Sequence, residues 1–359
     1  MWRGSVPPPR LGLLPASPRR AVGAGTQGTR SATTTGEAAC ARGSVSTMSD
    51  ATRQVLGPIG IWTGSLDLAP ASEARELAAE LEDLGYSTLW MPEVAGRDVF
   101  VHLALLLSST SRLVGATGIA NIWARDAVTM AGAMRGLTEA FPDRVVFGLG
   151  VSHRNLVEDL RGHRYEHPLG AMRRYLEAID AAPYTAERPS TPVRRVLAAL
   201  GPKMLALAAE LADGAHPYFV TPEHTAQARA ALGPQPVLCP EQAAVLETDP
   251  SEARQIARTY TSLYLSQPNY VRNLLRLGFD EADLVDGGSD AVVDALVAWG
   301  TVEDVVARVE AHLEAGADHV CVQPIVAGRR TIPRLQWQEL APALVETGRR
   351  HTSGRAAHP

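Results

Sequence analysis

The sequence predicts an α/β protein, and three observations make a (β/α)₈ TIM barrel the favoured architecture. Short apolar runs alternate with helical patterns through residues 54–348, and eight such runs can be counted. Eight strand–helix units within about 270 residues fit this fold, for which about 250 residues is typical, and parallel strands require such crossovers. A doubly wound open sheet is the alternative, but no G-x-G-x-x-G motif opens a helix after the first run.

The eight predicted strands are short β-rich runs bounded by turn residues or by helical patterns. They are Val55–Trp62, Ser87–Met91, Leu113–Ala120, Arg144–Gly150, Arg195–Leu200, Gly214–Phe219, Pro236–Leu246 and His319–Ile325. Catalytic groups of a TIM barrel lie at the C-terminal ends of its strands. The residues that follow each run are therefore the first candidates for chemistry.

The helix before the last strand carries its own start and stop signals. Residues 301–304 read Thr-Val-Glu-Asp, which resembles a capping box with acidic residues in the first turn. Val305, Val309 and Leu313 then recur every four residues, and Gly316 follows where a C-terminal glycine is expected. This pattern predicts an amphipathic helix that packs on the barrel.

The stretch from Asp249 to Gly300 is too long for one crossover, so we predict an extra helical insertion late in the barrel, beside the active face. The substrate pocket is expected to be built from loops and from this insertion. The insertion contains Tyr260, Tyr264, Tyr270 and Trp299 but no diagnostic charge cluster. The sequence therefore does not identify the substrate.

The two ends differ from the body of the chain. Residues 1–53 contain Pro-Pro-Pro and many small residues without apolar periodicity, so we expect a disordered tail. Its arginine-rich, acid-poor composition also resembles a mitochondrial transit peptide, but it forms no evident amphipathic helix. Because Met48 lies just before the first strand, an overextended start or a dispensable tail is preferred. Residues 349–359 are polar and are expected to fray.

Composition narrows the possible partners. The net charge is −5, but the first 48 residues hold six arginines and one acid, which leaves −10 on the remainder. An acidic body argues against nucleic acid. The longest apolar run, Val101–Leu107, is far shorter than the roughly 20 residues of a membrane span. Cys40, Cys239 and Cys321 show no paired spacing, which fits a reducing cytoplasm. The expected partner is a small-molecule substrate.

The strand ends supply aromatic and amide side chains and few paired acids. Trp62 follows the first strand, Glu93 the second, Asn121 the third, and Ser152 and His153 the fourth. This set suits a large planar ligand better than the hydrolysis of a polar one. Neither an H-x-x-x-H metal motif nor a G-x-S-x-G nucleophile elbow is present.

Two side chains at these ends can exchange protons. Glu93 directly follows an apolar run, which requires a functional reason, although a salt bridge to Arg97 would supply a structural one. A histidine after a strand is more often packed or exposed than catalytic, but the position of His153 at a barrel strand end favours catalysis.

The fifth strand runs directly into a helix through Leu200, Gly201, Pro202, Lys203 and Met204. Free N–H groups at a helix start bind phosphate, and Lys203 adds a positive charge. A well-formed turn without a ligand is an equally good interpretation. Lys203 is also the only lysine of the chain, so a Schiff-base barrel lyase is a remote alternative.

With these residues in place, the chain resembles the luciferase-like monooxygenase superfamily, specifically its bacterial oxidoreductases that depend on the deazaflavin coenzyme F420. The resemblance runs from about Leu56 to Ile325. The blocks that carry it are Leu89-Trp90-Met91-Pro92-Glu93 with Gly96-Arg97-Asp98, Ala116-Thr117-Gly118-Ile119-Ala120-Asn121-Ile122 with Ala124-Arg125-Asp126, Phe147-Gly148-Leu149-Gly150-Val151-Ser152-His153, Gly201-Pro202-Lys203-Met204 with Leu207-Ala208 and Ala212-Asp213-Gly214, and Glu314-Ala315-Gly316-Ala317-Asp318-His319-Val320.

The resemblance implies a barrel of the bacterial-luciferase type whose pocket holds the deazaflavin ring. Similar proteins have a non-prolyl cis peptide at the end of strand three, which would fall at Gly118-Ile119. The cofactor phosphate would meet the backbone at 200–204, and Asn121, Ser152 and His153 would line the ring edge or the substrate space. Similar proteins are commonly dimers, so a homodimer is expected.

The cofactor would determine the chemistry. A 5-deazaflavin carries carbon where a flavin has its reactive nitrogen, so it transfers hydride while the protein orients the substrate and handles protons. Glu93 or His153 would donate or accept the proton. Sugar-phosphate and alcohol-oxidising relatives carry a histidine where this chain has Val94, which argues against those reactions. An FMN-dependent monooxygenase and a barrel that binds cofactor without turnover are the alternatives.

Overall fold

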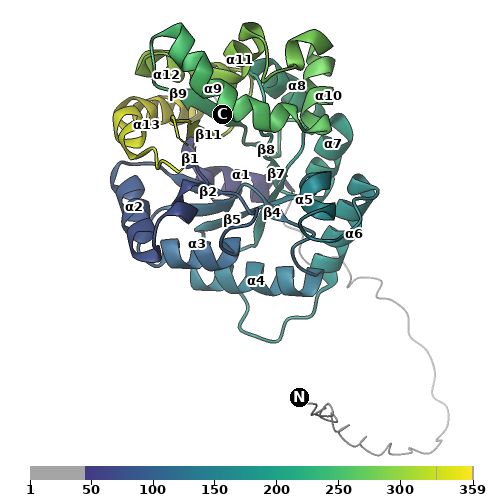
Figure 1. Ribbon diagram of the computed structural model, residues 1–359. Helices are drawn as coiled ribbons and strands as arrows, with labels where there is room; N and C mark the ends of the chain where they lie inside the picture. Colours follow the sequence, from purple (N-terminus) through teal and green to yellow (C-terminus); the bar gives the residue numbers. More distant parts are fainter. Residues whose placement is uncertain (1–44, 329, 358–359) are drawn as a thin grey trace, which may run out of the picture. The chain divides into compact units, whose positions relative to one another are not determined.

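A computed structural model describes residues 45–328 and 330–357, in which parallel strands alternate with helices (Figure 1). The strands are β1 (Ile59–Trp62), β2 (Thr88–Met91), β3 (Val114–Thr117), β4 (Ala120–Asn121), β5 (Val145–Gly150), β6 (Arg194–Leu197), β7 (Gly214–Ala215), β8 (Val237–Leu238), β9 (Glu241–Val245), β10 (Val297–Trp299) and β11 (Val320–Pro324). The α-helices are α1 (Val45–Leu56), α2 (Ala71–Asp83), α3 (Val99–Leu107), α4 (Ala127–Ala140), α5 (Arg154–Glu158), α6 (Pro168–Ala181), α7 (Pro202–Leu211), α8 (Pro222–Leu232), α9 (Pro250–Leu265), α10 (Pro268–Leu277), α11 (Asp290–Leu296), α12 (Val302–Glu314) and α13 (Arg334–Ala357). Two short 3-10 turns are η1 (Ser65–Leu68) and η2 (Glu281–Leu284).

The strands form a ring of parallel pairs. Their order is β10-β9-β11-β1-β2-β3-β5-β6-β7-β8, with β4 beside β5. Only Cys239 and Pro240 separate β8 from β9. Because β8 pairs with β7 and β9 pairs with β11, this single interrupted strand closes the ring. The predicted TIM-barrel fold is therefore confirmed.

Two layers of apolar side chains hold the barrel together. Inside the ring, buried residues such as Trp90, Val146 and Val196 form one cluster. A larger cluster fills the space between the strands and the surrounding helices, which Figure 1 shows around the outside of the ring. No helix among the described residues is long and apolar enough to cross a bilayer.

The predicted insertion is present between β9 and β10. It consists of α9, α10, η2 and α11, and its own apolar cluster includes Tyr260, Tyr270 and Leu274. The capping box that opens α12 at Thr301 is confirmed, as is the left-handed Gly316 after that helix. These signals were readable because each depends on residues close in sequence.

Several predicted strand limits were wrong for identifiable reasons. Val55 and Leu56 end α1 instead of beginning a strand. The strand predicted over Gly214–Phe219 ends at Ala215, shortly before Pro217, and Pro240 interrupts the one predicted over Pro236–Leu246. Proline has no N–H to donate to a ladder, so these prolines mark the breaks.

Parts of both predicted ends are ordered. Residues 45–53, predicted as tail, belong to α1, and Arg53 Nε donates to Asp318 at 2.8 Å. Thr52 is buried on the same helix. At the other end α13 continues through residues 349–357, which were expected to fray. Residues 1–44 and 358–359 lie outside the described part of the chain.

Candidate active site

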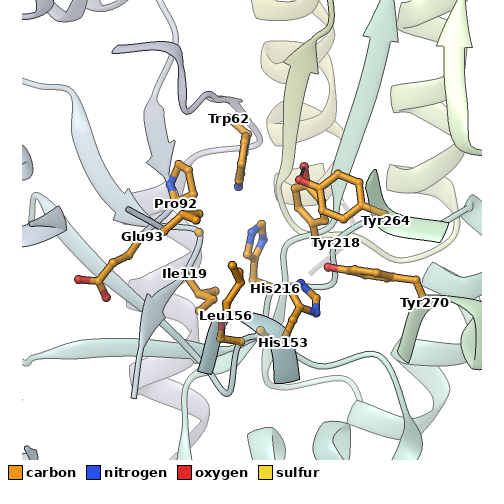
Figure 2. Close-up of a pocket in the computed structure, with 14 residues that line it drawn as sticks. Trp62, Pro92, Glu93, Ile119, His153, Leu156, His216, Tyr218, Tyr264 and Tyr270 are labelled. Carbon is orange, nitrogen blue, oxygen red and sulfur yellow. Dashed lines mark hydrogen bonds between the residues drawn. The ribbon is translucent and has the colours of Figure 1, made fainter. Parts of the chain in front are cut away.

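A pocket of about 290 Å³ lies where the strands end (Figure 2). Its lining comes from the ends of β1, β2, β3, β5, β6 and β7, from α5, and from α9 and α10 of the insertion. The lining residues are Trp62, Pro92, Glu93, Val94, Gly118, Ile119, Ser152, His153, Leu156, Ala198, His216, Tyr218, Tyr264 and Tyr270. The strand-end rule predicted four of these residues, Trp62, Glu93, Ser152 and His153, and the resemblance implied two more, Gly118 and Ile119.

The Gly118-Ile119 peptide bond is cis, as the resemblance implied. Gly118 also leaves no room for a side chain. A Cβ built on it would lie closer than 3.0 Å to Trp62 Nε1 and 3.2 Å from His216 Nε2. Glycine at this position therefore allows the indole and the imidazole to approach the same part of the pocket.

Two buried nitrogens at Gly118 have no hydrogen-bond partner. They are Trp62 Nε1, a donor, and His216 Nε2. His216 Nδ1 donates to the Cys239 carbonyl at 2.7 Å, which leaves Nε2 as an acceptor. Burial lowers the pKa of His216 to about 4, so the ring is neutral at pH 7. Because unpaired buried polar atoms are rare, this donor and acceptor indicate a place for a ligand group.

The Trp90 indole stacks on the His216 ring and holds it in place. The two ring centroids lie 4.3 Å apart. Trp90 Nε1 in turn donates to His319 Nε2 at 2.9 Å, and His319 Nδ1 donates to the Gly57 carbonyl at 2.7 Å. The acceptor on His216 is therefore held in one orientation before any ligand binds.

Glu93 is held by groups outside the pocket. Its carboxylate forms a buried ion pair with Arg125 and accepts a hydrogen bond from the Asn121 N–H at 2.8 Å. Figure 2 shows this carboxylate directed away from the other labelled residues. The ion-pair partner is Arg125, not Arg97, which bonds backbone carbonyls instead. Glu93 lines the pocket, but its carboxylate is engaged by Arg125 and by the Asn121 N–H, and its role in proton transfer stays a prediction.

His153 and Ser152 do face the pocket. His153 Nδ1 lies 3.3 Å from Asn269 Oδ1, and its ring packs 5.5 Å from that of Tyr270. Burial lowers the pKa of His153, which favours the neutral ring at pH 7. Ser152 has a left-handed backbone, φ 57°, and such residues are concentrated at functional sites. Asn121 is not part of the lining, because its Oδ1 accepts from the Trp123 N–H.

Tyrosines form the wall opposite the cis peptide. Tyr264 and Tyr270 come from the insertion, as the sequence led us to expect of the substrate pocket. Tyr218 and His216 were missed, since they were assigned to the interior of a strand that ends at Ala215. The signal that could have found them is Pro217, which ends the strand and places both neighbours at its C-terminal edge.

The 200–204 segment does not line this pocket. Gly201 precedes α7, and Arg276 of the insertion lies 3.6 Å from the position of a Cβ on that glycine. Arg276 in turn bonds to Asn273. Lys203 is exposed, so the Schiff-base lyase alternative finds no amine in the pocket. Sequence reasoning missed Arg276, which is distant along the chain.

Comparisons with known proteins agree with this geometry. The sequence model of the family described as luciferase-like monooxygenase matches residues 51–319. A Mycobacterium tuberculosis protein named as a candidate coenzyme F420-dependent oxidoreductase is 31% identical over 194 residues, which cover 46% of this chain and 56% of that relative. The 5,10-methylenetetrahydromethanopterin reductase of Methanolobus tindarius is 25% identical over 315 residues, 74% of this chain and 94% of the relative.

Solved structures share the fold. An F420-dependent secondary alcohol dehydrogenase in complex with an F420-acetone adduct has a TM-score of 0.65 and 14% identity, covering 80% of this chain and 99% of the other. The oxygenating constituent of a Pseudomonas putida diketocamphane monooxygenase, in complex with FMN, has a TM-score of 0.62 and 13% identity, covering 82% and 98%. The chain belongs to the luciferase-like monooxygenase family and is an oxidoreductase.

Proposed function

We propose that the protein transfers hydride between the deazaflavin coenzyme F420 and a small organic substrate. The observation that carries this proposal is the unpaired donor and acceptor, Trp62 Nε1 and His216 Nε2, beside the Gly118-Ile119 peptide. F420-dependent relatives support it. When bound, a deazaflavin supplies a carbon that gives or takes hydride.

The pocket fits the ring of this cofactor. A deazaflavin ring is flat and carries carbonyl and N–H groups along its pyrimidine edge, so it needs a donor and an acceptor close together. Trp62 and His216 would satisfy that edge, and glycine at position 118 lets both side chains lie close together beside it. The phosphate would bind near Gly201, where Arg276 and the exposed Lys203 supply positive charge.

The side chains of the pocket prepare it for hydride transfer. Tyr218, Tyr264 and Tyr270 form an apolar wall that would exclude water, which strengthens polar contacts within the pocket. His153, neutral at pH 7, can hold a substrate oxygen or nitrogen. Glu93 and Arg125 fix the turn that carries Asn121, so they position the pocket instead of reacting.

FMN is the second candidate cofactor, favoured by the shared fold of an FMN-bound monooxygenase. The two cofactors have similar ring edges and a phosphate, and the same pocket residues would contact either. They differ in reaction with oxygen, because the flavin has nitrogen where the deazaflavin has carbon. A direct binding comparison therefore separates the two functions.

The experiment is a titration of the full chain with F420 and, separately, with FMN, followed by cofactor fluorescence. We expect F420 to bind at micromolar concentration and FMN to bind at least tenfold more weakly. Trp62→Phe, which keeps an aromatic ring but removes the donor, should weaken F420 binding about tenfold. Absence of F420 binding at micromolar concentration would overturn the proposal, and tighter binding of FMN would favour the monooxygenase.

A further inference from the structure

The first turn of α10 brings two side chains of the insertion to His153. Asn269 and Tyr270 are consecutive residues of this turn. Asn269 Oδ1 lies 3.3 Å from His153 Nδ1, and the ring centroids of Tyr270 and His153 are 5.5 Å apart. His153 itself follows β5 and lines the pocket. The insertion and a strand end of the barrel therefore meet at this histidine.

The contact with Asn269 determines the tautomer of His153. An amide oxygen only accepts hydrogen bonds, so His153 Nδ1 carries the proton and donates it to Asn269 Oδ1. Nε2 is then an acceptor, and it forms no hydrogen bond with the described residues. Burial lowers the pKa of His153, while Tyr270 is the titratable side chain packed against the ring and no charged side chain of the described residues shifts this pKa. A neutral ring therefore offers the Nε2 lone pair at pH 7.

Tyr270 offers a hydrogen-bond donor beside this acceptor. Of the tyrosines that line the pocket, Tyr218 and Tyr264 have hydroxyls 2.8 Å apart, and Tyr218 also donates to Gln323 Oε1. The Tyr270 hydroxyl forms no hydrogen bond with the described residues, and Figure 2 shows it directed toward the centre of the labelled residues. The Tyr270 ring is held edge-on against Tyr264 and Phe219, with centroids 5.4 and 5.2 Å away. Burial raises the pKa of Tyr270, so its hydroxyl stays protonated at neutral pH.

We propose that His153 is the general base of the reaction, that Asn269 positions it, and that Tyr270 donates a hydrogen bond to the same substrate oxygen. This inference rests on the proposed function. A hydroxyl group donates one hydrogen bond and accepts others, so it matches an acceptor, His153 Nε2, beside a donor, the Tyr270 hydroxyl. A carbonyl oxygen only accepts and would leave His153 Nε2 unpaired. The substrate is therefore an alcohol, whose hydroxyl lies on the carbon that loses hydride.

His153 would supply the base from a strand end other than the one that the resemblance led us to expect. The alcohol-oxidising relatives carry a histidine where this chain has Val94, and Val94 lines the same pocket. Val94 cannot accept a proton, whereas His153, after β5, presents a free ring nitrogen. The absence of a histidine at position 94 therefore does not leave the pocket without a base.

The atoms and electrons balance in the direction of substrate oxidation. The C–H bond of the carbinol carbon breaks, and the hydrogen leaves with both electrons as hydride to the oxidised deazaflavin. The O–H bond breaks as well, its electron pair forms the second bond of the carbonyl, and the proton goes to His153 Nε2. This oxidises the alcohol to a ketone or an aldehyde and reduces the cofactor by two electrons. The imidazolium of His153 releases its proton to water after the product leaves.

The first test needs no cofactor. Nitrogen-15 NMR of the full chain, labelled at its histidine rings, identifies the His153 signals as those absent from His153→Gln. At pH 8 we expect the Nδ1–H tautomer in the parent and in Asn269→Asp, whose carboxylate accepts the same hydrogen bond. Asn269→Ala should allow both tautomers, whereas Gln267→Ala, at the cap of the same helix, should leave the tautomer unchanged. An Nε2–H tautomer in the parent, or an unchanged tautomer in Asn269→Ala, would overturn the proposal.

The second test follows the reduction of F420 by cyclohexanol and by benzyl alcohol as substrate probes. His153→Gln should lower kcat about 100-fold and Tyr270→Phe about tenfold, while the affinity for F420 stays unchanged. Tyr184→Phe is the control, because the Tyr184 ring packs on Arg135 and is not part of the pocket lining. Absence of F420 binding in the parent overturns the proposed function. F420 binding without reduction by either alcohol overturns the substrate class, and a kcat of His153→Gln within twofold of the parent overturns the base.

The pH profile separates a positioning role of Asn269 from a purely structural one. The parent kcat/KM should fall as the pH drops, with a midpoint below 6.5, because a protonated His153 cannot accept a proton. In Asn269→Asp the added negative charge favours the imidazolium, so the midpoint should move to higher pH while kcat at pH 8 stays within about threefold of the parent. Asn269→Ala should instead lower kcat about tenfold, with the affinity for F420 unchanged. An unchanged midpoint in Asn269→Asp would overturn the positioning role.

Discussion

The two walls of the pocket differ in origin and in chemistry. One wall, which we call the strand wall, is formed by Trp62, Gly118, Ile119, Ser152 and His153 at the ends of β1, β3 and β5. The facing tyrosine wall is formed by Tyr218 after β7 and by Tyr264 and Tyr270 of the insertion. Figure 2 shows His216 between them. The residues of the strand wall lie at the C-terminal ends of strands, as expected for a TIM barrel. The tyrosine wall depends in addition on how α9 and α10 of the insertion pack against the barrel.

The walls also differ in the partners of the buried acid behind each of them. The strand wall is backed by an ion pair, Glu93 with Arg125, in which both groups are charged. The tyrosine wall is backed by Glu241, whose partners are a hydroxyl and an N–H. A paired carboxylate fixes a structure, while an unpaired buried carboxyl keeps a proton. The two walls therefore differ in the buried acid behind them: Glu93 forms an ion pair, and Glu241 accepts hydrogen bonds from a hydroxyl and an N–H.

The largest expected effect is on the ion pair behind the strand wall. Glu93→Ala leaves Arg125 buried with only the half-exposed Asp98 as a charged partner, so the free energy of unfolding should fall by about 3–5 kcal/mol. Chemical denaturation measures it. Glu166→Gln, which breaks an exposed pair with Arg164, is the matched control and should change the free energy by less than about 1 kcal/mol. Equal effects of both substitutions would contradict a structural role for Glu93.

The next effect concerns Gly118, which lies against Trp62 and His216 in the pocket. Gly118→Ala would place a methyl group against Trp62 Nε1 and His216 Nε2, so F420 should bind about 10- to 100-fold more weakly, as expected for overpacking of 1–3 kcal/mol. Fluorescence titration measures the affinity. Gly132→Ala is the control, because a Cβ there has nothing within 4 Å. An F420 affinity within twofold of the parent would show that Gly118 does not lie beside the cofactor.

Sequence reasoning found the strand wall because its residues follow recognisable strands. It also named Tyr264 and Tyr270 within the insertion, but 3.6-residue periodicity does not reveal which face of a helix turns toward a distant pocket. His216 was missed through a strand limit set four residues too late. Arg125 was not recognised as the partner of Glu93, since the two are far apart in sequence. Residues close together in the sequence are enough to predict helices and strands. Contacts between residues far apart in the sequence, such as Glu93 with Arg125, become visible only in the folded structure.

A smaller and pH-dependent effect would sharpen the contrast between the two buried acids. The pKa of Glu241 is about 8 in the folded state against 4.5 for the free side chain. Between these values the unfolded chain binds fewer protons, so the free energy of unfolding falls as pH rises, with a limiting slope of about 1.4 kcal/mol per pH unit. Glu241→Gln should remove this slope, so the parent loses stability between pH 6 and pH 8 and the variant does not. Thermal melts at both values measure it, and an unchanged slope would contradict the protonated state.

The smallest expected effect lies outside both walls, at Lys203. Its side chain is exposed at the start of α7, where a single charge contributes about 0.3–1 kcal/mol and is screened by salt. Lys203→Ala should therefore weaken F420 binding only two- to fivefold at low ionic strength, with less effect in 0.5 M salt, and Lys203→Arg should bind like the parent. Arg276→Ala, which removes the guanidinium beside Gly201, should weaken binding more. If Lys203→Ala abolishes binding and Arg276→Ala does not, the phosphate lies on the outer side of the turn, away from the insertion, and the insertion serves the substrate alone.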